Sequence, residues 1–206
     1  MHRRSLVSNR ALAGELALVL AGFAAGCDDA ASPVHIVDVD DRTYLRGVQV
    51  SKLEIEPGHE VVRSELYLDR LRVAADELAP FELAWDTRDF GDGAHTLVAR
   101  IYLANGSYLD GSTAMWIDNT APQLGAIPST AMRGTSFAIP ATDNLKLARV
   151  EISRGVEGEA PVVVASDPFT VSWPWACGTT AIHVRAFDAA GGEVATDASV
   201  NGQSTR

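Results

Sequence analysis

Several aspartate and asparagine residues of this 206-residue chain are spaced so that their side-chain oxygens could meet at one place. Asp118 and Asn119 end one strand-like segment, Asp143 and Asn144 precede another, and Asp188 ends a third. Carboxylate and amide oxygens are the ligands that calcium prefers, whereas zinc prefers His and Cys. The pattern therefore predicts a calcium site formed by Asp118, Asn119, Asp143 and Asp188. The same residue types also dominate turns that bind no metal, and that interpretation stays open.

Residues for enzyme catalysis form no recognisable pattern. The five histidines show no HExxH or other metal-ligand spacing, and the chain has neither a GxSxG motif nor a glycine-rich phosphate loop. His95 follows a glycine turn and enters a strand, where we expect a turn or strand-edge hydrogen bond. We therefore expect no catalytic residues and a protein that is not an enzyme. An exported hydrolase, or an accessory domain or subunit of one, with its site built from distant loops, is the alternative.

Three aromatic residues are candidates for a binding face. Leu66 and Leu68 alternate toward the interior of their strand, so Tyr67 between them points outward. The same alternation points Tyr102 outward, and Trp116 could share that face. Sugar rings stack on flat aromatic side chains, and protein interfaces are enriched in Tyr and Trp. The alternative is that the tyrosines cover polar pairs beneath them and that Trp116 fills the edge of the fold.

Charged residues on these faces are expected to pair across neighbouring strands. We predict one ion pair between Glu65 and Arg100 and an equivalent pair between Glu151 and Arg185. Exposed cross-strand pairs of this kind contribute about 0.2 to 1 kcal/mol each. We interpret both as solvated surface pairs and not as a catalytic acid and base.

The first 27 residues have the features of an export signal. Three arginines precede an uninterrupted apolar run from Leu16 to Ala25, which is too short for a transmembrane helix of about 20 apolar residues. The run ends in Ala24-Ala25-Gly26-Cys27, which resembles the lipobox of bacterial lipoproteins, with Ala24 where Leu is commonest. The resemblance implies cleavage before Cys27 and a diacylglyceryl group on its thiol. The alternative is a plain signal peptide cut near Ala25.

Charge and cysteine content restrict the possible partners. The net charge is −10, and removal of the leader takes away more basic than acidic residues. A nucleic-acid partner would need a basic surface, so we expect none. Anionic lipid repels an acidic chain, so membrane contact is expected through the lipid anchor. With Cys27 acylated, Cys177 has no intramolecular partner and is expected to be a small apolar residue at a strand entrance, or otherwise a reactive thiol.

A repeat organises the rest of the chain. Segments 79–85 and 167–173 each place three apolar residues at alternate positions after a proline: Phe81, Leu83, Trp85 and Phe169, Val171, Trp173. Glycine turns and second strands follow at 92–107 and 177–192, at an offset of 85 to 88 residues. Period two indicates strands with one buried face. Beyond the leader no apolar stripe has helical spacing, and at most one short turn is expected, at 74–78. The chain is therefore predicted to be all-β, with two β-sandwiches in tandem.

The motifs of the two units also point to a family. The first unit contains ELYLD at 65–69, PFELAWD at 80–86 and DGAHTLVAR at 92–100, and DNTAP at 118–122 follows it. These segments resemble bacterial Ig-like domains that occur in tandem on surface proteins, and the second unit is similar but looser. The resemblance implies Ig-like domains at 34–119 and 120–200, followed by a polar tail at 201–206.

Together these features predict an exported protein that is anchored in the membrane of the cell envelope, in the periplasm or at the cell surface. Its tandem Ig-like modules would bind an envelope protein or glycan, or act as a spacer. Ig-like sandwiches carry many unrelated functions, so the fold alone does not choose among these roles.

Overall fold

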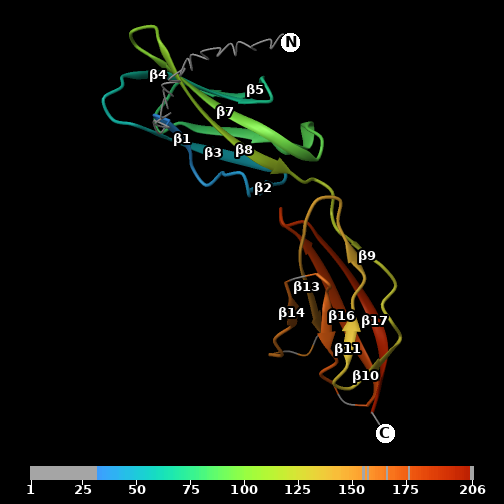
Figure 1. The fold of residues 1–206 in the computed structure, drawn as a ribbon. Helices are drawn as coiled ribbons and strands as arrows, with labels where there is room; N and C mark the ends of the chain where they lie inside the picture. Colours follow the sequence, from blue (N-terminus) through green and yellow to red (C-terminus); the bar gives the residue numbers. More distant parts are fainter. Residues whose placement is uncertain (1–31, 155, 157, 166, 176, 205–206) are drawn as a thin grey trace, which may run out of the picture. The chain divides into compact units, whose positions relative to one another are not determined.

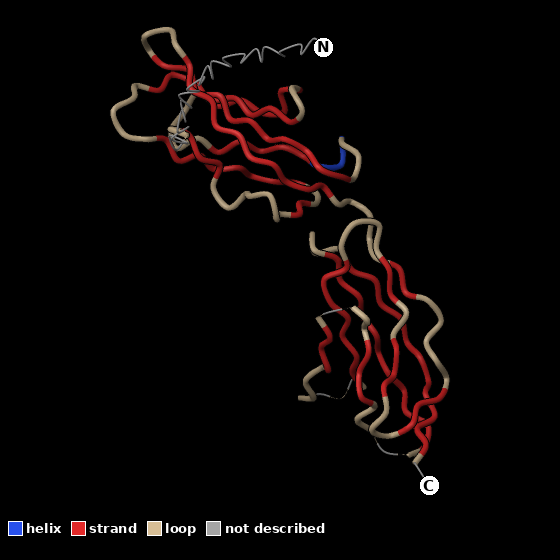
Figure 2. The backbone as a smooth tube through the Cα atoms, in the orientation of Figure 1, coloured by secondary structure: helices blue, strands red, loops and turns tan. Residues whose placement is uncertain are grey.

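Strands and turns make up nearly all of the computed structural model (Figures 1 and 2), which describes residues 32–204 except 155, 157, 166 and 176. Within these residues the only helical element is a single 3-10 turn, η1 (Thr87–Asp89). The predicted all-β class and tandem Ig-like sandwiches are confirmed. The leader, including Cys27, lies outside the described residues.

The first sandwich consists of a five-stranded and a three-stranded sheet. The five-stranded sheet has the order β2-β8-β7-β4-β5, with bounds Tyr44–Leu45, Tyr108–Ile117, Gly93–Leu103, Val61–Leu68 and Leu71–Asp76. The three-stranded sheet has the order β1-β3-β6, with bounds Val34–Ile36, Val48–Ile55 and Glu82–Asp86. In the larger sheet β2 runs parallel to β8, while the other neighbours are antiparallel.

The second sandwich repeats this arrangement with shorter edge strands. Its five-stranded sheet has the order β10-β17-β16-β13-β14, with bounds Thr130–Met132, Glu193–Gln203, Gly178–Asp188, Leu147–Ser153 and Val162–Val164. Two small pairs face it: β11 with β15 (Ser136–Ala138, Thr170–Ser172), and β9 with β12 (Gln123–Leu124, Ala141–Thr142). The edge strand β10 runs parallel to β17, as β2 does to β8.

Each sandwich has its own hydrophobic core, built by the alternating residues of its strands. In the first, Leu83 and Trp85 of β6 pack against inward residues of the larger sheet such as Leu66. In the second, Val171 of β15 and Trp173 just after it occupy the same places. Burial of such side chains is the main force that holds sheets face to face. The chain from Ser32 onward forms one compact unit that contains both cores.

One edge of the first sandwich differs from the expectation. Residues 74–78 were predicted to form a short turn, but β5 (Leu71–Asp76) is a strand that pairs with β4 along the edge of the five-stranded sheet. A two-residue turn at Asp69 and Arg70, both with positive φ, connects the two strands. Such paired positive φ angles are typical of a tight hairpin, and Asp tolerates them better than most residues.

Candidate functional site

The outer face of the five-stranded sheet in the first sandwich carries most of the predicted binding residues. Tyr67 on β4, Tyr102 on β7 and Trp116 on β8 all occupy outward positions, because the residues beside them in sequence are buried. Figure 1 shows the three strands side by side, and their pairing places Tyr67 opposite Val98 and Tyr102 opposite Tyr108.

A buried glutamate organises one end of this face. Glu65 is 1% exposed, and its carboxylate accepts hydrogen bonds from Arg63 (2.7 Å), Arg72 (2.7 Å), Tyr67 (2.6 Å) and Tyr102 (2.8 Å). Burial by itself would raise the pKa of Glu65, but these hydrogen bonds and the charge of Arg63 outweigh it and lower the pKa to about 2. The hydrogen bond to Glu65 in turn raises the pKa of Tyr67 to about 12. The two tyrosines therefore cover an ionised carboxylate, as one of the two interpretations of the sequence requires.

The predicted ion pair between Glu65 and Arg100 is wrong. The two residues are opposite each other in the sheet, but Arg100 instead forms a two-pronged ion pair with Asp110 of β8, at 2.8 Å for each nitrogen–oxygen contact. Arg72, on the unexpected strand β5, and Arg63 take the place of Arg100 at Glu65. The β7–β8 hairpin aligns Arg100 directly with Asp110, and the turn at 104–107 is the sequence signal that could have indicated this pairing.

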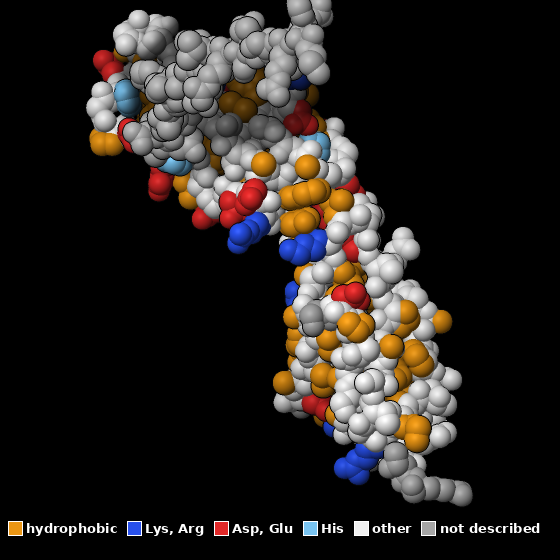
Figure 3. All heavy atoms as spheres, viewed as in Figure 1, with side chains coloured by type: hydrophobic (Ala, Val, Ile, Leu, Met, Phe, Trp, Pro, Cys, Tyr) orange, Lys and Arg blue, Asp and Glu red, His pale blue; other side chains and the backbone are white. Residues whose placement is uncertain are grey.

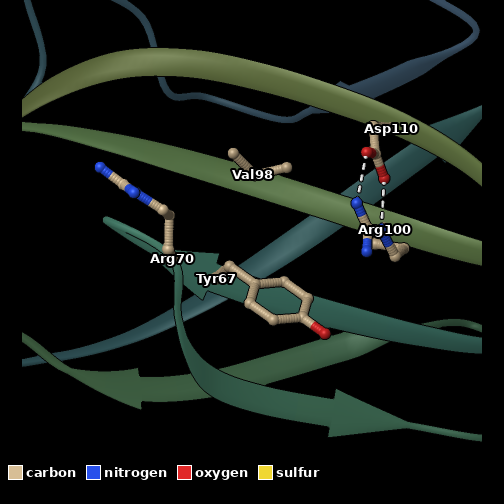
Figure 4. A pocket seen from close by; sticks show the side chains of 5 residues that line it. All are labelled: Tyr67, Arg70, Val98, Arg100 and Asp110. Atoms are coloured by element: carbon tan, nitrogen blue, oxygen red, sulfur yellow. Dashed lines mark hydrogen bonds and ion pairs between the residues drawn. The ribbon is translucent and has the colours of Figure 1, made fainter.

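A shallow hollow lies beside this ion pair on the same face (Figure 4). Its volume is about 400 Å³, and its lining residues are Tyr67, Arg70, Val98, Arg100 and Asp110. The guanidinium of Arg100 lies 4.3 Å from the ring centre of Tyr108, which is 55% exposed, and 5.7 Å from that of Tyr67. Such cation–π contacts hold the aromatic rings and the guanidinium in fixed positions. The hollow thus combines aromatic surface with fixed hydrogen-bonding groups.

Trp116 lies toward the other end of the sheet. It is opposite Ala94, eight residues before Tyr102 on β7, which corresponds to about 26 Å along a strand. Its ring stacks on Tyr44 of β2 at 5.8 Å, and its indole N–H donates to the carbonyl of Asp41. The structure therefore brings Tyr67 and Tyr102 together but places Trp116 apart from them, against the edge strand.

The corresponding face of the second sandwich is built differently. Glu151 and Arg185 form the predicted cross-strand ion pair at 3.4 Å. Arg185 also forms a two-pronged pair with Glu193, and Arg149 binds Glu151 at 2.7 Å. Phe187 occupies the place of Tyr102 of the first unit. The guanidinium of Arg149 lies over the Phe187 ring, 3.7 Å from the ring centre. Because Phe has no hydroxyl group, this face lacks the tyrosine-to-glutamate hydrogen bonds of the first.

The predicted calcium ligands divide into two groups. Asp118, Asp143 and Asp188 each place a carboxylate oxygen within 4.8 Å of the others. The side chain of Asn119 is engaged elsewhere: it accepts a hydrogen bond from the Thr87 hydroxyl (2.6 Å) and donates to the Thr87 carbonyl (3.0 Å). Asn119 therefore fastens the end of β8 to η1 and does not offer an oxygen to the cluster.

Asp92 also belongs to this region, although the sequence did not single it out. It accepts hydrogen bonds from the backbone N–H of Asn119 (2.7 Å), the hydroxyl of Thr120 (2.5 Å) and the amide of Asn144 (2.9 Å). Asp92 directly precedes the turn at Gly93. Because Asp is common at turns, nothing in the sequence indicated that Asp92 would bind residues 119, 120 and 144.

The remaining reactive side chains have local contacts. His95 binds Asp69 (2.6 Å) and the carbonyl of Gly91 (2.8 Å), and His183 binds Asp197 (2.8 Å). These contacts suit the turn and strand-edge role expected for His95. Cys177 immediately precedes β16, at the strand entrance that the sequence indicated, and it is exposed there.

Acidic and basic side chains are interspersed with apolar ones on the face shown in Figure 3. In the part of the chain that the structure describes, none of the helical segments has the length and apolar character needed to cross a bilayer.

No protein-family model and no curated protein matches the chain. Solved structures do: fibronectin(III)-like modules of CbhA from Clostridium thermocellum match with a TM-score of 0.52 and 19% identity, over 83% of this chain and 94% of that one. Murine CEACAM1b has a TM-score of 0.42 at 9% identity, over 84% and 100% of the two chains. The CD2-binding domain of CD58 has a TM-score of 0.41 at 9% identity, over 79% and 96%.

At 19% identity, the similarity to the fibronectin(III)-like modules concerns the fold. The arrangement of the two sandwiches suits this fold, because each combines a large, mainly antiparallel sheet with a smaller facing layer. The chain therefore has an Ig-like fold, with two sandwiches.

Proposed function

We propose that the chain is a non-enzymatic, exported module of the cell envelope, held to the membrane by a lipid on Cys27. Its first sandwich, which follows Cys27 within a few residues, binds an envelope protein or glycan through the outer face of the five-stranded sheet. The proposal of export and anchoring rests on the charged leader, the apolar run and the Ala24-Ala25-Gly26-Cys27 segment.

The observation that carries the binding function is the hollow beside the Arg100–Asp110 ion pair. Arg100 lines the hollow and also lies over the exposed ring of Tyr108, so one ligand could both stack on that ring and form hydrogen bonds in the hollow. Tyr and Arg are the residues that most often dominate binding energy at protein interfaces. Small sites of this kind bind through apolar surface and a few fixed polar groups.

Charge supports a polar or acidic partner. Four arginines gather on this face, Arg63, Arg70, Arg72 and Arg100, although the whole chain has a net charge of −10. Glu65 and Asp110 neutralise part of this charge, and Asp69 interacts with Arg70 at the same turn. Complementary charge of this kind accelerates and orients association with a negatively charged partner.

The test is a binding screen of the full chain against a glycan array and an envelope extract. We expect Tyr108→Ala and Arg70→Gln to weaken binding at least tenfold, because Arg70 lines the hollow and Tyr108 presents its exposed ring against Arg100. Neither substitution removes a hydrogen bond to Glu65. Tyr44→Ala is the matched control, since it removes a tyrosine at the far end of the same sheet. Unchanged binding in both test variants would contradict the proposed face.

The alternative, an accessory domain or subunit of an exported hydrolase, predicts a different result. In that case the full chain would capture the hydrolase from the envelope extract, whether or not any glycan on the array binds.

A further inference from the structure

Three aspartates from separate loops form a carboxylate cluster, defined here as Asp118, Asp143 and Asp188. Asp118 follows β8 at the end of the first sandwich, Asp143 follows β12, and Asp188 is the last residue of β16. Asp118 is fully buried, Asp188 is 2% exposed and Asp143 is half-buried. Carboxylates are rarely buried in this way unless a partner compensates their charge.

Backbone N–H groups hold two of the three carboxylates in place. Asp143 accepts hydrogen bonds from the N–H groups of Leu145 (2.9 Å) and Lys146 (2.8 Å) with one oxygen, Oδ2. Asp188 likewise accepts from Ala190 (2.9 Å) and Gly192 (2.7 Å) with Oδ1. Each of these aspartates therefore keeps a second oxygen whose position is fixed by the turn.

Those second oxygens, and both oxygens of Asp118, are buried without a hydrogen-bond partner among the residues that the structure describes. They are Oδ1 and Oδ2 of Asp118, Oδ1 of Asp143 and Oδ2 of Asp188. A buried polar atom without a partner is costly, and native proteins rarely retain one without a reason. Four such oxygens in one cluster are suited to a positively charged ligand.

The protein supplies too little positive charge of its own. Within the described residues the cluster makes one ion pair, from Arg46 to Asp188 at 3.9 Å, and the Arg46 side chain is 37% exposed. The nearby Lys146 instead lies over the ring of Tyr44, 5.4 Å from its centre. The carboxylate of Asp92 adds negative charge close by. Three ionised carboxylates thus face one distant guanidinium.

The same crowding acts on the charge of Asp118. Burial raises the pKa of Asp118 to about 6, and the charges of Asp143, Asp188 and Asp92 add to the shift. A bound cation would remove this repulsion.

We propose that the carboxylate cluster binds a calcium ion, which joins the end of the first sandwich to two loops of the second. Calcium binds oxygen ligands at about 2.3 to 2.6 Å, so two ligands of one ion are at most about 5 Å apart, and the cluster oxygens lie within 4.8 Å of one another. One divalent ion together with Arg46 balances the three carboxylates. Waters or backbone carbonyls complete the six to eight ligands that calcium requires.

The packing around Asp188 supports a built site. Gly192 donates its N–H to Asp188, and a Cβ at that position would collide with Asp188 Oδ2 and the Arg46 guanidinium. Glycine at this position therefore lets the Asp188 carboxylate and the Arg46 guanidinium lie directly against the backbone of the turn between β16 and β17.

The experiment compares the chelator-treated full chain with and without calcium, by calorimetric titration and by thermal melting at matched ionic strength. We expect saturable binding at submillimolar to millimolar calcium and a higher melting temperature, with a smaller effect of magnesium. Asp118→Asn should weaken binding at least tenfold. It should also raise the melting temperature of the metal-free chain, because it removes a buried charge and no hydrogen bond made by the described residues.

Two further variants make the result decisive. Asp143→Asn keeps one oxygen for the turn at Leu145 and Lys146, so it should fold normally and still lose calcium binding. Asp41→Asn, at an exposed position, should bind calcium as the unaltered chain does. The proposal is overturned if the unaltered chain shows no heat of binding and no change in melting temperature at 10 mM calcium, about tenfold above the weakest affinities of extracellular modules. An equal response to magnesium, or calcium binding by Asp118→Asn as tight as in the unaltered chain, would overturn it as well.

Discussion

At the scale of single residues, Glu65 shows how a charged side chain can be buried on the outer face of a β-sheet. Its carboxylate is buried, yet four donors on three strands surround it: Arg63 and Tyr67 on β4, Arg72 on β5 and Tyr102 on β7. A buried carboxylate is stable only with such a complete set of partners. Tyr67 and Tyr102 are therefore held rigidly, and the face beside the hollow is preorganised.

We expect the first sandwich to lose stability in acid because of Glu65. Its pKa is about 2 in the folded chain, against 4.5 when unperturbed, so the unfolded chain binds the proton more readily. The stabilisation is complete above about pH 5 and is lost as the pH falls toward 2. Glu65→Gln should remove it and lower the free energy of unfolding at pH 7 by about 2 to 3 kcal/mol, because the two arginines lose their buried partner.

Urea unfolding of the full chain between pH 7 and pH 2, followed by tryptophan fluorescence, measures this effect. Glu54→Gln, at an exposed position of β3, is the matched control. If Glu65→Gln showed the same acid dependence as the unaltered chain, the stabilising role of Glu65 would be refuted.

At the scale of secondary-structure elements, a glycine sets how closely two layers approach. Gly111 lies in β8, and a Cβ there would collide with the backbone carbonyl of Val34 in β1. Strand β1 pairs with β3 in the opposite sheet, so this approach closes one edge of the sandwich. Glycine within a strand often marks such a close backbone contact.

We therefore expect Gly111→Ala to destabilise the first sandwich. The methyl group must push backbone aside, which costs about 1 to 3 kcal/mol in overpacked cores. Gly91→Ala is the matched control, because nothing lies within 4 Å of a Cβ built there. Thermal melting of the full chain measures the difference. Equal melting temperatures for the two variants would show that β1 can move away from the methyl group without loss of stability.

The sequence predicted the strands that have one buried face. The alternation around Leu83 and Val171 gave β6 and β15 because their apolar residues face the cores. The same reasoning missed β5. This strand lies at the edge of its sheet and has no buried residue, so its sequence shows no sustained alternation of apolar and polar residues. The misassigned partner of Arg100 follows from that failure, since Arg72 of β5 is the residue that reaches Glu65.

At the scale of the whole molecule, the repeat predicted two cores but not the details of the carboxylate cluster. Asp118, Asp143 and Asp188 were expected to converge because each ends or precedes a strand near the junction of the two units. That Asn119 binds Thr87 instead, and that Asp92 takes part, depends on contacts between loops far apart in sequence. Such contacts follow from tertiary packing, and residue types and spacing do not encode them.

The remaining prediction concerns how the whole chain reaches a membrane. Its net charge is −10, so anionic lipid head groups repel the chain as a whole. One acyl chain gives only weak, reversible binding, whereas two chains anchor a protein stably, and a diacylglyceryl group on Cys27 would supply two. We therefore expect the chain, produced in a bacterium fed labelled palmitate, to carry the label and to sediment with membranes. Cys27→Ser should lose both properties, while Cys177→Ser, which alters the exposed second cysteine, should keep them. Equal labelling of Cys27→Ser and the unaltered chain would exclude lipid attachment at Cys27 and favour a plain signal peptide cut near Ala25.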